Sequence, residues 1–78
     1  MSRAVTVYTT NTCPYCVMVK NFLHDQGISF EEVNVQENPE AGEQLVKKTG
    51  QMGVPQIEIG GQWVLGYDPE TIMELLEK

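Results

Sequence analysis

Residues 4–16 read AVTVYTTNTCPYC. This stretch begins with a run of β-forming residues and ends in a Cys-Pro-Tyr-Cys motif, which opens an apolar-patterned stretch from Val17 to Leu23. We therefore place the motif where a strand gives way to a helix. A helix start has unpaired backbone N–H groups and a partial positive charge, and both favour an anion. This position favours a cysteine thiolate.

The two cysteines of the motif have different expected depths. Cys13 stands at the helix start and is the expected thiolate, with a pKa below the ~8.5 of a free thiol. Pro14 suits the first helical position, because its missing N–H costs nothing there. Cys16 follows three residues later, on the same helix face but one turn deeper. One sulfur is thus placed to attack a disulfide and the other to resolve the product.

Two other interpretations of the C-x-x-C spacing are weaker. A zinc site needs four ligands, and the chain has only two Cys and one His, His24. We therefore expect no resident metal. A purely structural disulfide across so short a loop would stabilise the fold little, because the entropic gain grows with loop length. Redox chemistry is the favoured interpretation.

Length and composition indicate a small globular protein. The 78 residues suffice for one core, and we expect a single domain over residues 1–78. No apolar run is long enough for a signal peptide or for the roughly 20 residues of a membrane span. We expect a cytoplasmic protein without a membrane partner. In a reducing compartment, two Cys at this spacing indicate catalysis rather than stapling.

The chain is acidic, with a formal net charge of −6 and five Lys and Arg in total. Nucleic acid is not expected as a partner, because phosphate binding needs clustered basic residues. The same charge repels anionic small thiols such as glutathione at long range, unless basic residues lie near the site.

Periodicity and turn residues predict the element order βαβαββα, an α/β arrangement. Asn38-Pro39-Glu40 and Asp68-Pro69-Glu70 each supply a cap, a first-turn proline and an early acid, and Gly60-Gly61 predicts a hairpin. The first two strands should be parallel through a right-handed crossover, and the last two antiparallel. The predicted strands are Arg3–Thr9, Ile28–Val35, Val54–Ile59 and Trp63–Leu65, and the predicted helices are Pro14–Gln26, Pro39–Thr49 and a C-terminal helix after Asp68.

Three motifs resemble those of the glutaredoxin family. They are Cys13-Pro14-Tyr15-Cys16 after Tyr8-Thr9-Thr10-Asn11-Thr12, Gly53-Val54-Pro55-Gln56-Ile57, and Gly66-Tyr67-Asp68 before the last helix. The resemblance covers essentially the whole chain and implies a thioredoxin fold, with a four-stranded mixed sheet flanked by three helices. It also implies thiol-disulfide exchange and a cis Val54-Pro55 peptide beside the reactive cysteine. The residues so implied are catalytic Cys13 and Cys16 and substrate-binding Pro14, Tyr15, Val54, Pro55, Gly66, Tyr67 and Asp68.

The chain departs from glutathione-dependent family members in two places. Many of these carry a lysine just before the active-site loop, where this chain has Thr10-Asn11-Thr12. Their usual Gly-Gly-x-Asp-Asp is here Leu65-Gly66-Tyr67-Asp68-Pro69. These features are similar to the small redoxins that supply ribonucleotide reductase and receive electrons from thioredoxin reductase. The electron donor is left open between glutathione and thioredoxin reductase, and no tightly bound cofactor is expected.

The leading hypothesis is a monomeric dithiol oxidoreductase that reduces protein or glutathione mixed disulfides. Disulfide-containing proteins are the expected partners, and ribonucleotide reductase is a candidate among them. The alternative is a binding module in which Cys13 from two chains and two glutathiones hold an iron–sulfur cluster. Family members that bind a cluster usually lack the second cysteine or have a smaller residue than Pro14, which disfavours this alternative.

The predicted first helix also suggests a docking surface. Helical spacing leaves Val17 and Met18 outside the buried stripe and partly exposed beside Cys13. Apolar surface next to a reactive group often marks a docking site. We therefore predict that thioredoxin reductase or a protein disulfide docks across Tyr15, Val17, Met18 and Tyr67.

Four further side chains carry weaker expectations. Trp63 is expected in core or hairpin packing rather than as a ligand platform, and the core is favoured because large aromatic residues usually bury most of their area. His24 and Glu32 are expected on solvated faces. Lys20, one turn beyond Cys16, is expected to be solvated, with the alternative that it holds a thiolate or a carboxylate.

Overall fold

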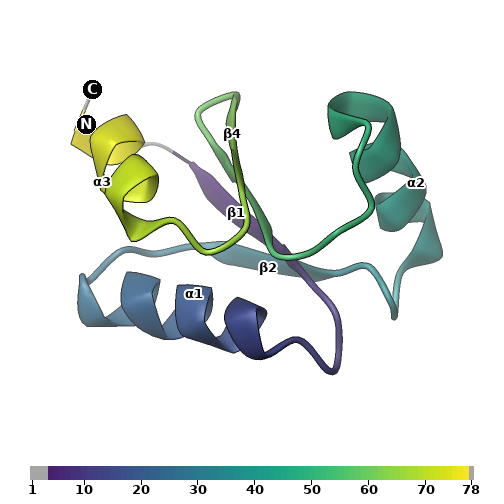
Figure 1. Ribbon diagram of the computed structural model, residues 1–78, viewed down its shortest axis with the longest axis horizontal. Helices are drawn as coiled ribbons and strands as arrows, with labels where there is room; N and C mark the ends of the chain where they lie inside the picture. Colours follow the sequence, from purple (N-terminus) through teal and green to yellow (C-terminus); the bar gives the residue numbers. More distant parts are fainter. Residues whose placement is uncertain (1–3, 78) are drawn as a thin grey trace.

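The computed structural model describes residues 4–77, which form four strands and three helices in the predicted order (Figure 1). The strands are β1 (Val5–Thr9), β2 (Glu31–Asn34), β3 (Gln56–Ile59) and β4 (Gln62–Leu65). The helices are α1 (Pro14–Asp25), α2 (Pro39–Thr49) and α3 (Pro69–Glu77). Arg3, the predicted start of the first strand, lies outside the described residues.

The strands form one mixed sheet in the order β2-β1-β3-β4. β1 is parallel to β2, as the predicted crossover through α1 requires, and antiparallel to β3. β3 and β4 form the predicted antiparallel hairpin around Gly60 and Gly61. The sheet therefore has the mixed, four-stranded arrangement that the family resemblance implies.

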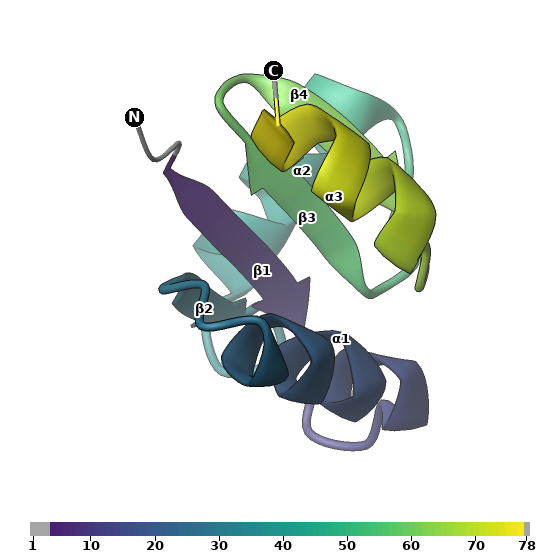
Figure 2. The same ribbon diagram turned by 90° about the vertical axis from the view of Figure 1, so that its left-hand side faces the viewer.

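Helices α1 and α3 cover one face of the sheet, and α2 lies on the other (Figure 2). Val5 and Val7 alternate with Thr6 and Tyr8 along β1, so the valines turn toward α1 and α3. The main core lies on this face and consists of Val5, Val7, Val19, Leu23, Ile57, Ile59, Val64 and Ile72. Burial of apolar side chains from five elements in one cluster provides the main stabilisation of a chain this short.

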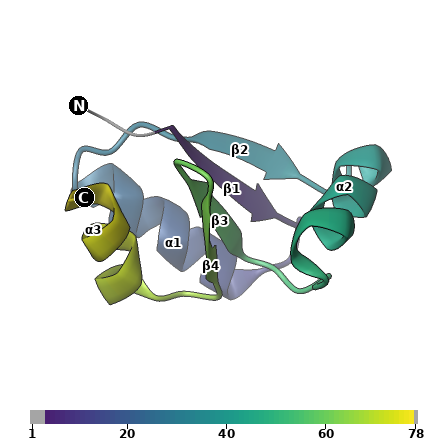
Figure 3. The same cartoon turned by 90° about the horizontal axis from the view of Figure 1, so that it is seen from above.

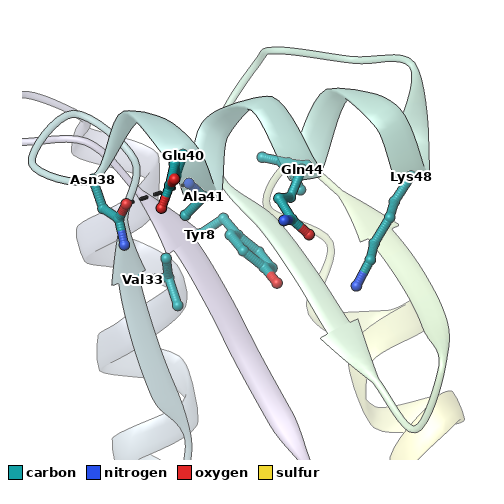
Figure 4. A pocket seen from close by; sticks show the side chains of 8 residues that line it. Tyr8, Val33, Asn38, Glu40, Ala41, Gln44 and Lys48 are labelled. Carbon is teal, nitrogen blue, oxygen red and sulfur yellow. Dashed lines mark hydrogen bonds between the residues drawn. The ribbon is translucent and has the colours of Figure 1, made fainter.

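The second face of the sheet is less completely covered. α2 lies toward the end of the sheet where β1 ends (Figure 3). It buries Leu45, beside a hollow of about 350 Å³ above the ring of Tyr8 (Figure 4). Trp63 lies next to Tyr8, with ring centroids 5.6 Å apart. Burial and then the carboxylates of Glu58 and Glu31 raise the pKa of the Tyr8 phenol.

The expected place of Trp63 in the core is therefore wrong. Its side chain is only half-buried and lies outside the main cluster. The register pairs Trp63 with Glu58 and Glu58 with Thr6, which places all three on the face away from α1 and α3. A half-covered sheet face suits a large aromatic ring that packs against a neighbouring ring.

Helix boundaries follow the local signals closely. α2 has the predicted bounds: Ala41 N–H donates to Asn38 Oδ1 at 3.4 Å at its start (Figure 4), and Gly50 ends it at φ 73°. α3 is capped by Asp68, whose Oδ1 accepts from Thr71 N–H at 3.2 Å. α1 ends at Asp25, one residue before the prediction, since Gln26 is its C-cap.

Strand boundaries differ more from the predictions. β2 begins at Glu31, three residues after the predicted start, because Ile28 N–H still bonds Leu23 O at the end of α1. β3 begins at Gln56, since Pro55 has no N–H for the ladder. No helix in the described part of the chain is long and apolar enough to cross a membrane.

Candidate active site

The site is the Cys13–Cys16 disulfide at the start of α1. Pro14 occupies the first turn as predicted, and Cys13 is the N-cap residue. Cys13 is half-buried, whereas only 1% of Cys16 is exposed. This difference in depth follows the predicted one, and it leaves the Cys13 sulfur as the one that a partner can reach.

The helix start provides an electrostatic environment for the Cys13 sulfur. Cys16 N–H donates to Cys13 Sγ at 3.2 Å, so the sulfur takes the place of a capping oxygen. A thiolate formed at this atom keeps the N–H bond and lies at the positive end of the helix dipole. The sulfur of Cys13 thus lies where the helix start favours an anion.

The second predicted motif lies directly opposite this sulfur. The carbonyl oxygen of Val54 is 3.7 Å from Cys13 Sγ, although the residues are 41 positions apart. A disulfide sulfur has no proton, so this is a van der Waals contact here and becomes a hydrogen bond only for the thiol. The Val54–Pro55 peptide is cis, as the family resemblance implies. Pro55 is buried, and Val54 is half-buried at the edge of the site.

The third motif is joined to the second through the backbone. Gly66 N–H donates to the Pro55 carbonyl at 2.9 Å, and its φ of 82° is one that side chains rarely adopt. Tyr67 is exposed beside it. The Asp68 carboxylate accepts from Thr71 N–H and from Thr71 Oγ1, at 3.2 and 2.7 Å, so both oxygens serve the first turn of α3. The three motifs therefore come together, and Asp68 acts structurally within one of them.

The loop before Cys13 is held by polar side chains, of which Asn34 and Gln36 were not singled out from the sequence. Asn11 N–H donates to Gln36 Oε1 at 3.1 Å, and Asn34 Nδ2 is bonded to Asn11 Oδ1 at 2.6 Å. Asn34 Oδ1 in turn accepts from Gln36 N–H at 2.9 Å. Asn34 stands near the end of the predicted second strand, and asparagine is a common turn residue, which is the only local signal for it. These bonds fix the approach to Cys13 against the end of β2.

Glu32 is exposed as expected, and its carboxylate also joins two other elements. It accepts from the buried Thr9 hydroxyl at 2.8 Å and from Lys20 Nζ at 3.0 Å. These bonds, that of Lys20 first, lower the pKa of the Glu32 carboxyl. Lys20 thus holds a carboxylate, which was the alternative for it, and His24 is exposed as expected.

The large exposed apolar side chains flank the three motifs. Val17 and Met18 are 50% and 43% exposed, as predicted from helical spacing. Met52 and Leu65, which the sequence did not single out, are 80% and 54% exposed. With Tyr15 and Tyr67 they make up all six large exposed hydrophobic residues among residues 4–77, and we call this set the apolar rim. Each member lies within two residues of one of the three motifs.

Charge at the site is low. The three motifs contain no Lys or Arg, and their one acidic residue, Asp68, caps α3. Within residues 4–77 no three His, Cys, Asp or Glu side chains are grouped so that they could hold a metal ion. The surface around Cys13 is thus apolar and backbone-lined rather than ionic.

Comparisons with known proteins agree with this geometry. The family model described as glutaredoxin matches residues 5–64. An uncharacterized glutaredoxin-like 8.6 kDa protein in the rubredoxin operon of Clostridium pasteurianum is 35% identical over 74 residues, which cover 95% of this chain and 99% of that protein. Glutaredoxin 3 of Escherichia coli K12 is 41% identical over 64 residues, which cover 82% of this chain and 77% of that protein.

A solved structure gives the same result for the fold. The glutaredoxin-like NrdH-redoxin from Escherichia coli, which is described as having a thioredoxin-like activity profile, superposes with a TM-score of 0.83. Its sequence is 33% identical, and the match covers 92% of this chain and 93% of that one. The expected thioredoxin fold is confirmed.

Proposed function

The chain belongs to the glutaredoxin family, and from this premise we propose that it reduces disulfides of proteins and is itself re-reduced by thioredoxin reductase. The family and the Cys13–Cys16 pair make it a thiol-disulfide oxidoreductase. The proposal adds the substrate class and the electron donor. We place the reaction in the cytoplasm, where thiols are kept reduced, and assign it to the monomer.

The proposed reaction transfers two electrons to the substrate. The Cys13 thiolate attacks one sulfur of the substrate disulfide; that S–S bond breaks, and the leaving sulfur takes up a proton. Cys16, deprotonated, then attacks Cys13 Sγ in the mixed disulfide and releases the second substrate thiol. The product is the Cys13–Cys16 disulfide, which is the form that the structure contains. An external dithiol donor returns both sulfurs to the reduced state.

The roles of the cysteines are supported by their surroundings. Cys13 is accessible and accepts the N–H of Cys16, which suits a nucleophile. Cys16 is buried behind it and can reach only the sulfur of Cys13. We assign substrate contacts to Pro14, Tyr15, Val54 and Tyr67, and we assign Pro55, Gly66 and Asp68 to shaping the surface on which the substrate lies.

The apolar rim is the observation that carries the choice of partner. A protein surface can cover exposed apolar side chains that flank the three motifs, and this contact gives affinity without charge. Glutathione is a small anion, and the three motifs offer it no Lys or Arg. The likeness to NrdH-redoxin, with its thioredoxin-like activity profile, supports the same donor.

A coupled assay tests the donor directly. The protein is incubated with one protein disulfide substrate and NADPH, once with thioredoxin reductase and once with glutathione and glutathione reductase. We expect steady NADPH oxidation with thioredoxin reductase and little with the glutathione system. Ribonucleotide reductase is the second substrate to include, as a candidate physiological partner. Faster turnover with glutathione than with thioredoxin reductase would overturn the proposed donor.

A further inference from the structure

Gln56, the first residue of β3, has a buried side chain with an unusual set of partners. Only 1% of the residue is exposed. Its Nε2 donates to the carbonyls of Gln51 and Gly53, at 3.1 and 2.8 Å. A buried amide must find partners for its polar atoms, and both donors of Gln56 find them in one short segment.

The segment that Gln56 holds has little other support. Residues 51–53 lie outside helices and strands, and within residues 4–77 no backbone-to-backbone hydrogen bond holds them. Among the described residues, only Thr49 bonds to the segment besides Gln56, through Oγ1 and the N–H and carbonyl of Gln51. The conformation of residues 51–53 therefore depends on two side chains.

The acceptor of the same amide is not used. Gln56 Oε1 is buried and has no hydrogen-bond partner among the described residues. An unpaired buried acceptor costs stability, so an apolar side chain of similar length would serve the core better. The presence of an amide here is explained by its two donors and the carbonyls that they orient.

The segment leads directly into the active site. Gly53 precedes Val54, whose carbonyl is 3.7 Å from Cys13 Sγ. Met52 lies between the two carbonyls that Gln56 turns inward, and its side chain is 80% exposed. The amide of Gln56 thus fixes both the backbone edge at Val54 and the outward direction of one member of the apolar rim.

We propose that Gln56 is a positioning residue for substrate docking. Its amide shapes residues 51–53 so that a protein disulfide meets the Val54 edge and the Met52 side chain as it reaches Cys13. This role rests on the proposed reduction of protein disulfides. It affects how the partner binds and leaves the reactivity of the sulfur unchanged.

The test is Gln56→Met, assayed with dithiothreitol as reductant so that the result does not depend on the donor. Met is similar in length, apolar and suited to a buried position, so the variant should fold. For insulin we expect a KM higher by about fivefold to tenfold, the effect of losing one or two ordinary hydrogen bonds. For hydroxyethyl disulfide, kcat and KM should stay within about twofold, because a small disulfide does not use the Met52 contact.

Two controls separate docking from structure and chemistry. Gln62→Met makes the same change at an exposed position of the β3–β4 hairpin, whose Gly60 N–H bonds to Ala4 before β1, the end opposite Cys13. This control variant should have the same kcat and KM as the parent protein for both substrates. The pH dependence of Cys13 alkylation by iodoacetamide should be the same in Gln56→Met and in the parent protein, because the N–H that Cys13 Sγ accepts comes from Cys16 in α1 and does not depend on Gln56.

Every result of this test either supports or overturns the docking role of Gln56. A selective rise in the insulin KM supports the role, whereas unchanged kinetics, equal loss with both substrates or a shifted alkylation profile overturns it. If Gln56→Met does not fold, Met52→Ser replaces it at an exposed position, and an unchanged insulin KM in that variant overturns the docking role. A parent protein that reduces neither substrate overturns the proposed function, and the docking role with it.

Discussion

Two segments meet at the disulfide, and they are held in different ways. Residues 13–16 begin α1, and their geometry comes from the helix backbone and from the N–H that Cys13 Sγ accepts. Residues 51–54 lie outside helices and strands, and the side chains of Thr49 and Gln56 hold them. The first segment carries the chemistry and the second carries part of the docking surface. Because their supports are separate, chemistry and partner recognition can be changed independently.

The largest effect is expected from replacing the cysteines of residues 13–16. Cys13→Ser should abolish exchange with every disulfide, because it removes the nucleophile. Cys16→Ser should instead trap mixed disulfides, because Cys13 still attacks but nothing resolves the product. Mass spectrometry of each variant after incubation with a protein disulfide measures the adduct. Adducts on Cys13→Ser with none on Cys16→Ser would reverse the assigned roles.

The next prediction tests whether Val17 and Met18, two members of the apolar rim on α1, contribute to docking and not to the chemical step. Val17→Ser combined with Met18→Lys should raise the KM for thioredoxin reductase or a protein disulfide about tenfold, as loss of a moderate interface contact does. Turnover of hydroxyethyl disulfide should be nearly unchanged, because both side chains are already half-exposed and the fold does not need them. Steady-state kinetics with both substrates measures the split.

The matched control for that variant is Asn21→Lys, which adds the same charge at an exposed position further along α1. It should leave both KM values unaffected. Equal loss with the small and the protein substrate, or no loss with either, would show that the rim on α1 has no docking role.

A smaller effect is expected from the other support of residues 51–54. Thr49→Val removes the hydroxyl that accepts Gln51 N–H at 3.2 Å, while both bonds of Gln56 remain. We expect the KM for insulin to rise about twofold to fivefold, which corresponds to about 0.5–1 kcal/mol, because the bonds between this hydroxyl and Gln51 are exposed to solvent. Thr49→Ser keeps the hydroxyl and should behave like the parent protein. A KM effect in Thr49→Val larger than that of Gln56→Met would contradict the assigned order of the two supports.

The smallest effect is expected from Glu32, which bonds Thr9 at the end of β1, just before residues 13–16. Glu32→Gln should lower the free energy of unfolding by about 0.5–1 kcal/mol at pH 7, because this half-exposed charge is screened by solvent. Lys20 and Thr9 lower the pKa of Glu32 in the folded state, so its contribution exists above the ordinary glutamate pKa of ~4.3. The contribution disappears as the pH falls through the lowered value.

Urea denaturation at several pH values measures this difference. The parent protein and the variant should converge in the acidic range, and turnover near pH 7 should be equal in both. A stability difference that is the same at neutral and acidic pH would mean that the charge of Glu32 is not responsible for it.

Most of the fold was accessible from local signals in the sequence. The bounds of α2 follow from Asn38, Pro39 and Gly50, which cap and end a helix by contacts within a few residues. The predicted β2 is too long, because Ile28 pairs with the end of α1 and not with β1. Trp63 was misplaced because its face depends on the register with β3, which periodicity alone does not give.

Part of the candidate site could likewise be predicted from the sequence, and part of it could not. The Cys13–Cys16 pair and the exposure of Val17 and Met18 follow from helical spacing, and the structure contains both. Met52 and Gln56 could not be singled out, because one is an exposed loop residue and the other an ordinary polar residue at a strand start. Their significance comes from what lies next to them in space.

The sequence by itself determined the features that arise within one turn or one hairpin. These are the order of the elements, the helix caps and the placement of Cys13 at a helix start, where the backbone supplies the N–H that its sulfur accepts. The packing of distant segments brings Val54 to Cys13 across 41 positions and turns the carbonyls of Gln51 and Gly53 inward. These features depend on the pairing of β1 with β3, a contact between distant residues that no local pattern records.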